Sequence, residues 1–238
     1  TPSNFELLGL EQHMQHYAGD IRDRSRLAQV IDEFRPDIVF HLAAQAIVSK
    51  SFQDPLHTIS TNVIGTINIL ESLRKLKQSI KCVLITSDKS YFNVEWPWGY
   101  KETDRLGGKD IYSGSKAAAD ILIESYFHTY LKYKSNISVA VGRAGNVIGG
   151  GDWAKDRIVV DCIKAWSQGK IAEIRSPNAT RPWQHVLEPL SGYLHLGAEL
   201  DVKDDLNGEP FNFGPNTKQN PTVEELIIDL SKQNESLQ

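Results

Sequence analysis

The sequence predicts an α/β fold of the doubly wound class, in which helices cover both faces of a parallel sheet. Three short apolar runs rich in β-branched residues, at 37–43, 80–87 and 137–145, have the composition of strands buried on both faces. Longer segments with helical periodicity separate them. This alternation is typical of βαβ units, in which right-handed crossovers join parallel strands.

Helices are expected before, between and after these strands. Apolar residues recur every three or four positions from His57 to Lys77 and again across 112–132, which gives each segment one apolar stripe. A shorter helix is predicted at 25–34, because Pro36 ends it and makes the next segment extended. The remaining predicted elements are helices at 157–168, in "LEPLSGYLHLGAEL" and at 221–233, and a strand in "PFNFGP".

The amino-acid composition of the chain changes after Gly145. The stretches "GNVIGGGDW" and "RSPNATRPW" are rich in Gly, Pro and Asn, which is typical of loops. Ligands of doubly wound sheets bind beyond the carboxyl ends of the strands, where such loops emerge. The late part of the chain is therefore a candidate substrate-binding lobe.

Composition excludes several classes of protein. The 238 residues are 40% hydrophobic and 24% charged, with a net charge of −4 and no basic block, so we expect neither a nucleic-acid partner nor an anionic membrane surface. The apolar runs have strand length and no basic segment precedes one, so we expect a cytoplasmic protein. Cys82 and Cys162 have no second Cys or His at metal-ligand spacing, which predicts buried free thiols and no metal site.

A tyrosine and a lysine four residues apart open the second long helix. Tyr112 and Lys116 in "YSGSK" share one helix face, one turn apart. An ammonium beside a phenol stabilises the phenolate, which is then a general base for an alcohol. Such a pair is more often a packed ring and a solvated amine. Ser87, at the end of the preceding strand, adds the hydroxyl that makes a catalytic group plausible.

The hydroxyl, tyrosine and lysine resemble the constellation of the short-chain dehydrogenase/reductase family, extended branch. Within it, the chain resembles the CDP-glucose 4,6-dehydratases on "TSDKSYFNVEWPWGYKETDRLGGKDIYSGSKA", "GRAGNVIGGGDWAKDR" and "RPWQHVLEPLSGYL". The resemblance implies a Rossmann-type sheet with a smaller substrate-binding lobe. Residues 1–145 would form part of the dinucleotide-binding domain and 146–238 mainly the lobe, with about 186–215 returning to the Rossmann domain.

The resemblance also implies a lyase reaction that uses tightly held NAD. Hydride leaves C4 of the glucosyl unit of CDP-glucose while Tyr112 removes the C4 hydroxyl proton, water leaves across C5 and C6, and hydride returns to C6. The product is CDP-4-keto-6-deoxyglucose, and no external reductant is used. Members of this family pair through two long helices, which implies a homodimer or dimer of dimers through 57–77 and 112–132.

The resemblance gives roles to the trio that follows the second strand. Ser87 falls where a hydroxyl hydrogen-bonds the C4 oxygen, and Asp88 where an acid protonates the departing C6 hydroxyl. Lys89 stands where dTDP-glucose dehydratases carry a Glu base for the C5 proton. A lysine base must be neutral, which requires desolvation or nearby cations such as Lys116. The alternative is that Lys89 is a charged partner of Asp88 and another group takes the C5 proton.

Cofactor residues are implied only in part. The acid and apolar side chain of "AGDIRD" would surround the adenine, the small residues of "HLAAQA" would let the backbone approach, and an Asn on the long helix would support the site, with a plain surface amide as the alternative. These residues, together with the tyrosine and lysine, are Asp20, Ile21, Ala43, Ala44, Gln45, Asn62, Tyr112 and Lys116. His41 is expected to be a packed histidine without a chemical role.

The phosphate-binding loop of such proteins is not found. No G-x-G-x-x-G or G-x-x-G-x-x-G stands between a predicted strand and helix. "TPSNFELLGL" resembles the approach to a third strand, so we expect the first βαβ unit to lie upstream of residue 1 and the chain to be truncated at both ends. Binding of NAD by this chain alone is then expected to be crippled, because the helix N-terminus that receives the pyrophosphate is absent.

Substrate-side residues come from the late motifs. Asn146 matches a position that contacts the nucleotide phosphates, and the guanidinium groups of Arg157 and Arg181 suit the diphosphate and nucleoside. Trp183 and His185 are expected to shape the pocket. One further aromatic group either forms a wall against glucose and nicotinamide or packs its own loop: Trp96, Trp98 and Tyr100.

Two other interpretations share these residues. A nucleotide-sugar 4-epimerase needs the Ser, Tyr and Lys but no further acid and base, so "SDK" counts against it. A non-catalytic or truncated dinucleotide-binding homologue is the other, and the intact Tyr112 and Lys116 count against it. The sequence therefore favours a nucleotide-sugar dehydratase.

Overall fold

The computed structural model describes residues 3–216 and 220–235. The chain divides into two compact units. The larger unit comprises Tyr17–Ala144 and Leu187–Phe213, and the smaller unit comprises Thr1–His16, Gly145–Val186 and Gly214–Gln238.

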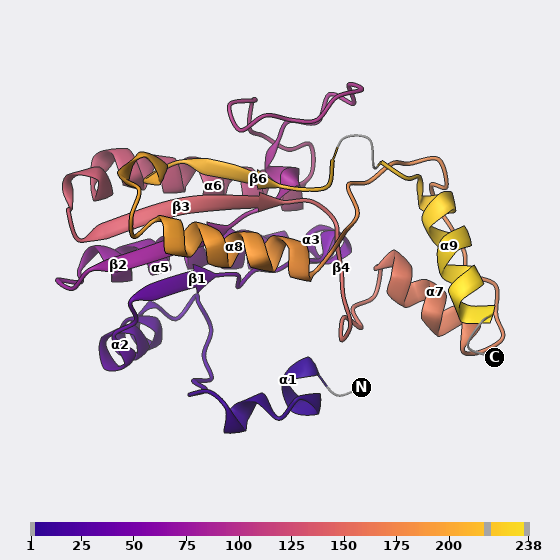
Figure 1. The fold of residues 1–238 in the computed structure, drawn as a ribbon, viewed down its shortest axis with the longest axis horizontal. Coiled ribbons are helices and arrows are strands. Elements are labelled where there is room, and N and C mark those ends of the chain that lie inside the picture. The colour runs from indigo at the N-terminus through magenta and orange to yellow at the C-terminus, as the bar shows by residue number, and fades with distance from the viewer. Residues whose placement is uncertain (1–2, 217–219, 236–238) are drawn as a thin grey trace. The chain divides into compact units, whose positions relative to one another are not determined.

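A parallel sheet forms the centre of the larger unit (Figure 1). Its strands are β1 (Ile38–His41), β2 (Ile80–Ile85), β3 (Ile137–Ala144) and β6 (Pro210–Phe213), in the order β1-β2-β3-β6, and every pair is parallel. The carboxyl ends of parallel strands lie along one edge of a sheet, so the segments that follow β1 and β2 emerge side by side. The predicted doubly wound α/β class is confirmed.

Helices cover both faces of this sheet. On one face lie α2 (Arg24–Phe34), α5 (Gly65–Arg74) and α6 (Ile111–Thr129), and on the other lies α8 (Leu187–Glu199) (Figure 1). The helices predicted at 25–34, at 112–132 and in "LEPLSGYLHLGAEL" are confirmed with ends shifted by a few residues. The strand predicted in "PFNFGP" is β6.

Alternate residues of β2 and β3 belong to two separate cores, which is the two-residue period of a strand buried on both faces. The core beneath α5 and α6 contains Ile80, Cys82, Leu84, Ile137, Val139, Val141, Leu70, Leu73 and Ile123. The core beneath α8 contains Val83, Ala140, Ala144, Tyr193, Leu196 and Leu200. Cys82 and Cys162 are buried free thiols, as predicted, and burial raises the pKa of Cys82 to about 12.

Strand β1 is less buried than predicted, although its Val39 and Phe40 pack against the two cores. Ile38 is 40% exposed and, beyond the end of the strand, Leu42 is 49% exposed, whereas His41 is buried. The reason is its position, because β1 pairs only with β2 within the residues that the structure describes.

The helix predicted at 57–77 contains a π-helical turn and ends at Arg74. Helices α3 (Val48–Gln53) and α4 (Pro55–Ile59) precede a π-helical turn, η2 (Ser60–Ile64), which leads directly into α5 (Gly65–Arg74). The predicted helix is thus confirmed over 55–74 with a π-helical turn inside it, in which Asn62 bonds to Gln45 and Ser115. Such π-turns are frequent at functional sites.

The smaller unit contains a two-stranded parallel ladder and short helices. Strands β4 (Val147–Ile148) and β5 (Gln184–His185) pair with each other, and Thr180 bridges Thr222. Its helices are α1 (Asn4–Leu7), α7 (Ile158–Trp166) and α9 (Val223–Glu235), and the last two confirm the helices predicted at 157–168 and 221–233. Single 3-10 turns complete the two units: Leu10–Gln12, Asp88–Ser90, Leu131–Tyr133 and Asp204–Leu206.

Over 3–216 and 220–235, no helix combines the length and the apolar character that a membrane span requires.

Candidate active site

The trio that follows β2 forms a tight hydrogen-bonded turn. The 3-10 turn η3 (Asp88–Ser90) begins directly after Ser87, whose hydroxyl donates to Asp88 Oδ1 at 3.0 Å and accepts from the Lys89 N–H at 3.2 Å. The Ser90 N–H donates to Ser87 O and the Tyr91 N–H to Asp88 O. A hydroxyl and a carboxylate thus lie in contact at the carboxyl end of a buried strand.

Lys89 lies against Asp88. Its Nζ is 3.9 Å from Asp88 Oδ2, and 40% of its side chain is exposed. That exposure does not supply the desolvation that a neutral lysine base needs. The contact fits the alternative in which Lys89 is the charged partner of the acid.

Tyr112 and Lys116 are buried in the first turns of α6. Asp110 caps this helix by accepting from the Ser113 N–H at 2.9 Å and from the Ser113 hydroxyl at 2.7 Å, which fixes where the helix begins. Lys116 is 6% exposed, and burial lowers its pKa to about 8 although the nearby Asp120 carboxylate opposes the shift. At neutral pH the lysine therefore still carries its proton, as an ammonium that stabilises a phenolate must.

Turn η3 lies against helix α6, which carries Tyr112 and Lys116. Within the larger unit η3 packs against α6, so the structure brings Ser87, Asp88 and Lys89 to the helix that carries Tyr112 and Lys116. The sequence spacing between them did not establish this proximity; the parallel order of β2 and β3, with α6 as their crossover, produces it.

Asn62 joins this helix to the segment after β1. Its side-chain amide donates to Ser115 Oγ at 2.9 Å and to Gln45 O at 3.1 Å, and its Oδ1 accepts from the Gln45 N–H at 2.8 Å. Ser115 in turn donates to Tyr112 O at 2.7 Å. Because Asn62 is 2% exposed, the alternative of a plain surface amide is wrong.

A hollow of about 420 Å³ opens beside Gln45 in the larger unit. It contains three of the residues predicted for the cofactor, Asp20, Ala44 and Gln45, and five that the sequence argument missed: Ala46, Ile47, Lys50, His57 and Thr61. Ala46 closes the motif "HLAAQA" and Ile47 follows it, whereas no motif marks Lys50, His57 and Thr61, which come from α3, α4 and η2.

Polar groups in the hollow suit a nucleoside. Arg22 donates to both oxygens of Asp20 and holds the pKa of that carboxyl at about 2, and its Nη1 is 2.9 Å from His57 Nδ1. The Thr61 hydroxyl is buried and has no hydrogen-bond partner among the residues that the structure describes. A ligand with hydroxyl groups or ring nitrogens would supply the missing hydrogen bond to the Thr61 hydroxyl.

Five predicted cofactor residues do not line the hollow: Ile21, Ala43, Asn62, Tyr112 and Lys116. Ile21 instead packs on α5, where a Cβ at Gly65 would stand 2.5 Å from Ile21 Cδ1, and Asn68 donates to Ile21 O at 2.9 Å. These contacts fix the backbone next to Asp20. Ala43 is exposed in the segment after β1.

His41 is buried at the end of β1, as expected. Its Nε2 lies 3.1 Å from Thr66 Oγ1. Burial, together with the charge of Lys116, lowers the pKa of His41 to about 4, so the imidazole is neutral at physiological pH. Nothing in its contacts gives it a part in proton transfer.

The aromatic residues of the loop between η3 and α6 pack mainly on one another. Tyr100 stacks on Tyr91 with ring centroids 5.1 Å apart, and Trp96 lies 5.3 Å from Tyr100 and 5.8 Å from Trp98. Trp98 is 64% exposed. These contacts fit the alternative in which the rings pack their own loop.

The predicted substrate residues all lie in the smaller unit. Asn146, Trp183 and His185 belong to one ladder or its ends, where the Gln184 N–H donates to Asn146 O at 3.0 Å. Trp183 Nε1 is buried and has no acceptor within the described part of the chain.

The two arginines of this set already have protein partners. Arg157 precedes α7, and its Nε is 3.5 Å from Asp152 Oδ2. Arg181 donates to Thr180 O at 2.7 Å. Both guanidinium groups are partly exposed, so their remaining donors can reach an anion.

Known proteins resemble this chain along most of its length. The family model described as GDP-mannose 4,6 dehydratase matches residues 6–208. A CDP-glucose 4,6-dehydratase from Salmonella typhimurium is 44% identical over 233 residues, which are 96% of this chain and 65% of that protein. A dTDP-glucose 4,6-dehydratase from Xanthomonas campestris is 26% identical over 95% of this chain and 65% of its own. The chain thus spans about 65% of the length of these relatives.

Solved structures share the fold. A dTDP-glucose 4,6-dehydratase from Bacillus anthracis in complex with NAD superposes with a TM-score of 0.77 at 25% identity, covering 96% of this chain and 68% of the other. A UDP-glucuronic acid 4-epimerase from Bacillus cereus in complex with UDP-glucuronic acid and NAD gives a TM-score of 0.81 at 22% identity, with the same coverage. The Rossmann-type class predicted from the sequence is confirmed by these likenesses.

Proposed function

The chain belongs to the GDP-mannose 4,6 dehydratase family, and on that premise we propose that it acts as a CDP-glucose 4,6-dehydratase, a lyase that forms CDP-4-keto-6-deoxyglucose. One observation carries the proposal: the Ser87 hydroxyl and the Asp88 carboxylate are in contact on a turn that packs against the helix of Tyr112 and Lys116. A dehydratase needs an acid beside the oxidation site, whereas an epimerase does not. The 44% identical CDP-glucose relative supports the nucleotide.

We assign these side chains the roles that the family resemblance implies. Tyr112 takes the proton of the C4 hydroxyl, Lys116 stabilises the phenolate by its charge, and Ser87 hydrogen-bonds the C4 oxygen. Asp88 then protonates the departing C6 hydroxyl. The chemistry that NAD supplies when bound is acceptance of one hydride from C4 and its return to C6.

The hollow beside Gln45 is proposed to hold the nucleoside end of NAD. Asp20, Ala44 and Gln45 line it, and the Thr61 hydroxyl, which lacks a partner among the described residues, could bond to the bound nucleoside. Ile21, Ala43 and Asn62 would act by shaping the backbone around the cofactor rather than through the hollow itself. In the smaller unit, the nucleotide sugar would be bound by Asn146, Arg157, Arg181, Trp183 and His185.

Lys89 has two candidate roles: base for the C5 proton, which the resemblance implies, or charged partner of the acid, which its 3.9 Å contact with Asp88 supports. Lys89→Met separates them. If Lys89 is the base, C4 oxidation still appears as transient NADH absorbance at 340 nm while elimination stalls. Turnover at the wild-type rate would show that neither role is needed, and a fall in elimination that is restored by Lys89→Arg, which keeps the charge but cannot act as a base, identifies the charged partner.

Self-association and cellular setting complete the proposal. Apolar side chains are exposed on the segments that would pair: Ile59 and Ile64 in 57–77, and Ile121 and Tyr130 in 112–132. A homodimer, or a dimer of dimers, would bury them. We place the protein in the cytoplasm, in deoxysugar biosynthesis for O-antigen or lipopolysaccharide.

The test is incubation of the protein with NAD+ and CDP-glucose, followed by mass spectrometry, with dTDP-glucose and UDP-glucose as matched substrates. Loss of one water from CDP-glucose alone is the expected result. A product of unchanged mass with inverted C4 would instead identify an epimerase. Absence of binding to every nucleotide sugar and to NAD would identify a non-catalytic homologue.

A further inference from the structure

We propose that a buried ion pair, Arg143 with Asp120, positions the Ser87–Ser90 turn against α6 by bonding to the residues at both of its ends. Neither residue was singled out by its sequence motif, and neither contacts the turn's own reactive groups. We call this ion pair, with its bonds to both ends of the turn, the clamp. The effect of the clamp on turnover rests on the proposed function, whereas the existence of the clamp does not.

The pair has the geometry of a fixed clamp. Arg143 Nε and Nη2 donate to Asp120 Oδ2 at 2.9 Å and Oδ1 at 2.7 Å, and both side chains are almost completely buried. Arg143 lies on β3, and Asp120 lies on α6, one helical turn beyond Lys116. A two-pronged bond of this kind fixes direction as well as distance. It therefore ties the strand to the helix that carries Tyr112 and Lys116.

The same pair holds the entrance and the exit of the turn. Thr86, which immediately precedes Ser87, donates its hydroxyl proton to Asp120 Oδ2 at 2.8 Å. Tyr91, which immediately follows Ser90, accepts at its hydroxyl oxygen from Arg143 Nη1 at 2.9 Å. Each end of the turn is thus bonded to one partner of a single ion pair.

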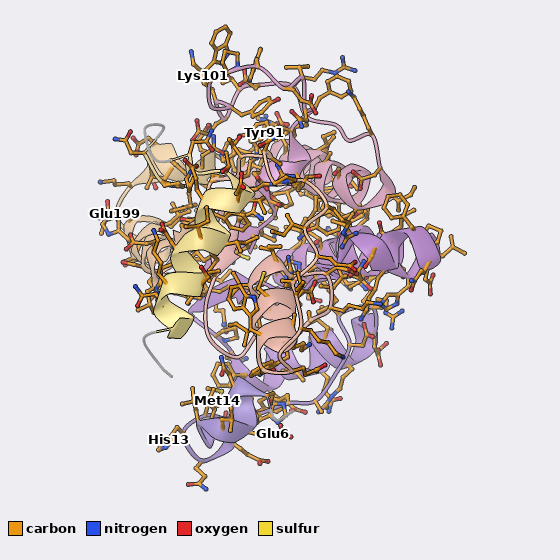
Figure 2. The ribbon with its side chains drawn as sticks, turned by 90° about the vertical axis from the view of Figure 1, so that its right-hand side faces the viewer. Glu6, His13, Met14, Tyr91, Lys101 and Glu199 are labelled. Carbon is orange, nitrogen blue, oxygen red and sulfur yellow. The ribbon has the colours of Figure 1, made fainter. Side chains whose placement is uncertain are left out.

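The bonds continue into the loop that follows. Arg143 Nη1 also donates to Glu102 O at 2.9 Å, and the Tyr91 hydroxyl donates to Asn212 Oδ1 at 2.7 Å. Asn212 on β6 in turn donates to Tyr100 O at 2.9 Å. Figure 2 labels Tyr91 below the loop that carries Lys101. The base of that loop is therefore held by the same network.

Stability alone does not explain a charged pair here. Burying two charges carries a desolvation cost that well-packed apolar residues avoid. Apolar residues, however, cannot direct bonds at once to Thr86 and Tyr91. What the pair provides is the placement of the hydroxyl and carboxylate of η3 relative to α6, and catalysis depends steeply on such placement.

Two conservative variants test the clamp without breaking the ion pair. Thr86→Val removes the bond to Asp120, and Tyr91→Phe removes the bonds to Arg143 and Asn212. Ser72→Ala is the matched control, since it removes one buried hydrogen bond, Ser72 Oγ to Asn68 O at 2.8 Å, on α5. Backbone hydrogen exchange of the peptide covering 87–91 needs no substrate. We expect faster exchange there in both variants and an unchanged rate in the control; exchange that is unchanged in all three overturns the clamp.

The kinetic arm addresses positioning during turnover. With CDP-glucose we expect kcat to fall about tenfold in Thr86→Val and Tyr91→Phe while KM stays at the wild-type value, because the proposed substrate residues lie elsewhere. Ser72→Ala should match the wild type in both constants. Unchanged kcat in the two variants of an active enzyme overturns the catalytic consequence. A wild type without activity on any nucleotide sugar overturns the proposed function, and the exchange measurement still decides the clamp.

Discussion

Polar groups are used differently in the two compact units. In the larger unit, Arg143 and Asp120 are 4% and 3% exposed and belong to a continuous network. In the smaller unit, ion pairs such as Arg175 with Asp156 stand at the surface, with 82% of the Arg175 side chain exposed. The first arrangement fixes geometry, and the second leaves donors available to a ligand. The larger unit also has exposed ion pairs, such as Arg22 with Asp20, but it contains in addition a pair whose geometry is fixed by burial.

The largest expected effect comes from breaking the buried pair. Arg143→Met leaves the Asp120 carboxylate buried without its guanidinium, which should lower the free energy of unfolding by about 3–5 kcal/mol. Arg175→Met, which removes the exposed pair of the smaller unit, should cost about 0–1 kcal/mol. Urea denaturation followed by circular dichroism measures both. Equal losses in the two variants would contradict the contrast between the units.

A buried histidine gives the next effect, through pH. The pKa of His41 is about 4 in the folded protein against 6.5 when exposed, so the unfolded chain takes up a proton that the folded chain refuses. Stability from this group is complete above pH 6.5 and is lost as pH falls to 4, by about 3 kcal/mol.

His41→Gln should therefore flatten the pH dependence of the free energy of unfolding between pH 6.5 and 4. His13→Gln, at an exposed position of the smaller unit, should leave that dependence as it is in the wild type. Denaturant titrations at several pH values give the comparison. A wild-type slope in His41→Gln would show that another group is responsible.

Lys116 predicts a pH effect on turnover. Burial lowers its pKa to about 8, so above that pH the lysine loses the charge that stabilises the phenolate. We expect kcat to fall about tenfold per pH unit above pH 8. In Lys116→Arg the cation persists, so the residual activity should stay level over the same range. A fall of equal steepness in Lys116→Arg would assign the titration to a different group.

Helix caps give the smallest effect and separate stability from activity. Asp110→Ala removes the cap of α6, and Thr222→Ala removes the cap that accepts from the Glu225 N–H at 3.1 Å before α9. Each should cost about 1 kcal/mol of unfolding free energy. Only Asp110→Ala should also lower kcat, because α6 carries Tyr112 and Lys116. Parallel thermal melts and steady-state kinetics check this.

Much of the larger unit could be predicted because its strands and helices follow simple periods. The apolar runs gave β2 and β3, and the helical stripe of 112–132 gave α6. The π-turn at Ser60–Ile64 could not be predicted, and its Asn62 bonds to Gln45 and Ser115, which are distant in sequence. The local periodicity of apolar residues contains no information about contacts between residues distant in sequence.

The sequence motifs predicted the reactive side chains of the candidate site, but not the residues that line the hollow or hold the turn in place. "SDK" and "YSGSK" name side chains with recognisable chemistry, whereas Lys50 and His57 reach the hollow only through α3 and α4. A signal for Arg143 was present, because a charged residue inside the apolar run "ISVAVGRAG" must have a buried partner. Finding Asp120 as that partner required the fold.

The π-turn also constrains the number of residues between Asp54 and Gly65. Asp54 caps α4 on one side of it, and Gly65 meets Ile21 on the other, so both ends of the segment are anchored. Each α-helical residue turns the chain by about 100°, and removing one residue between these anchors would rotate Asn62 away from Ser115. Relatives that keep this contact should therefore vary in the identity of the intervening residues but not in their number.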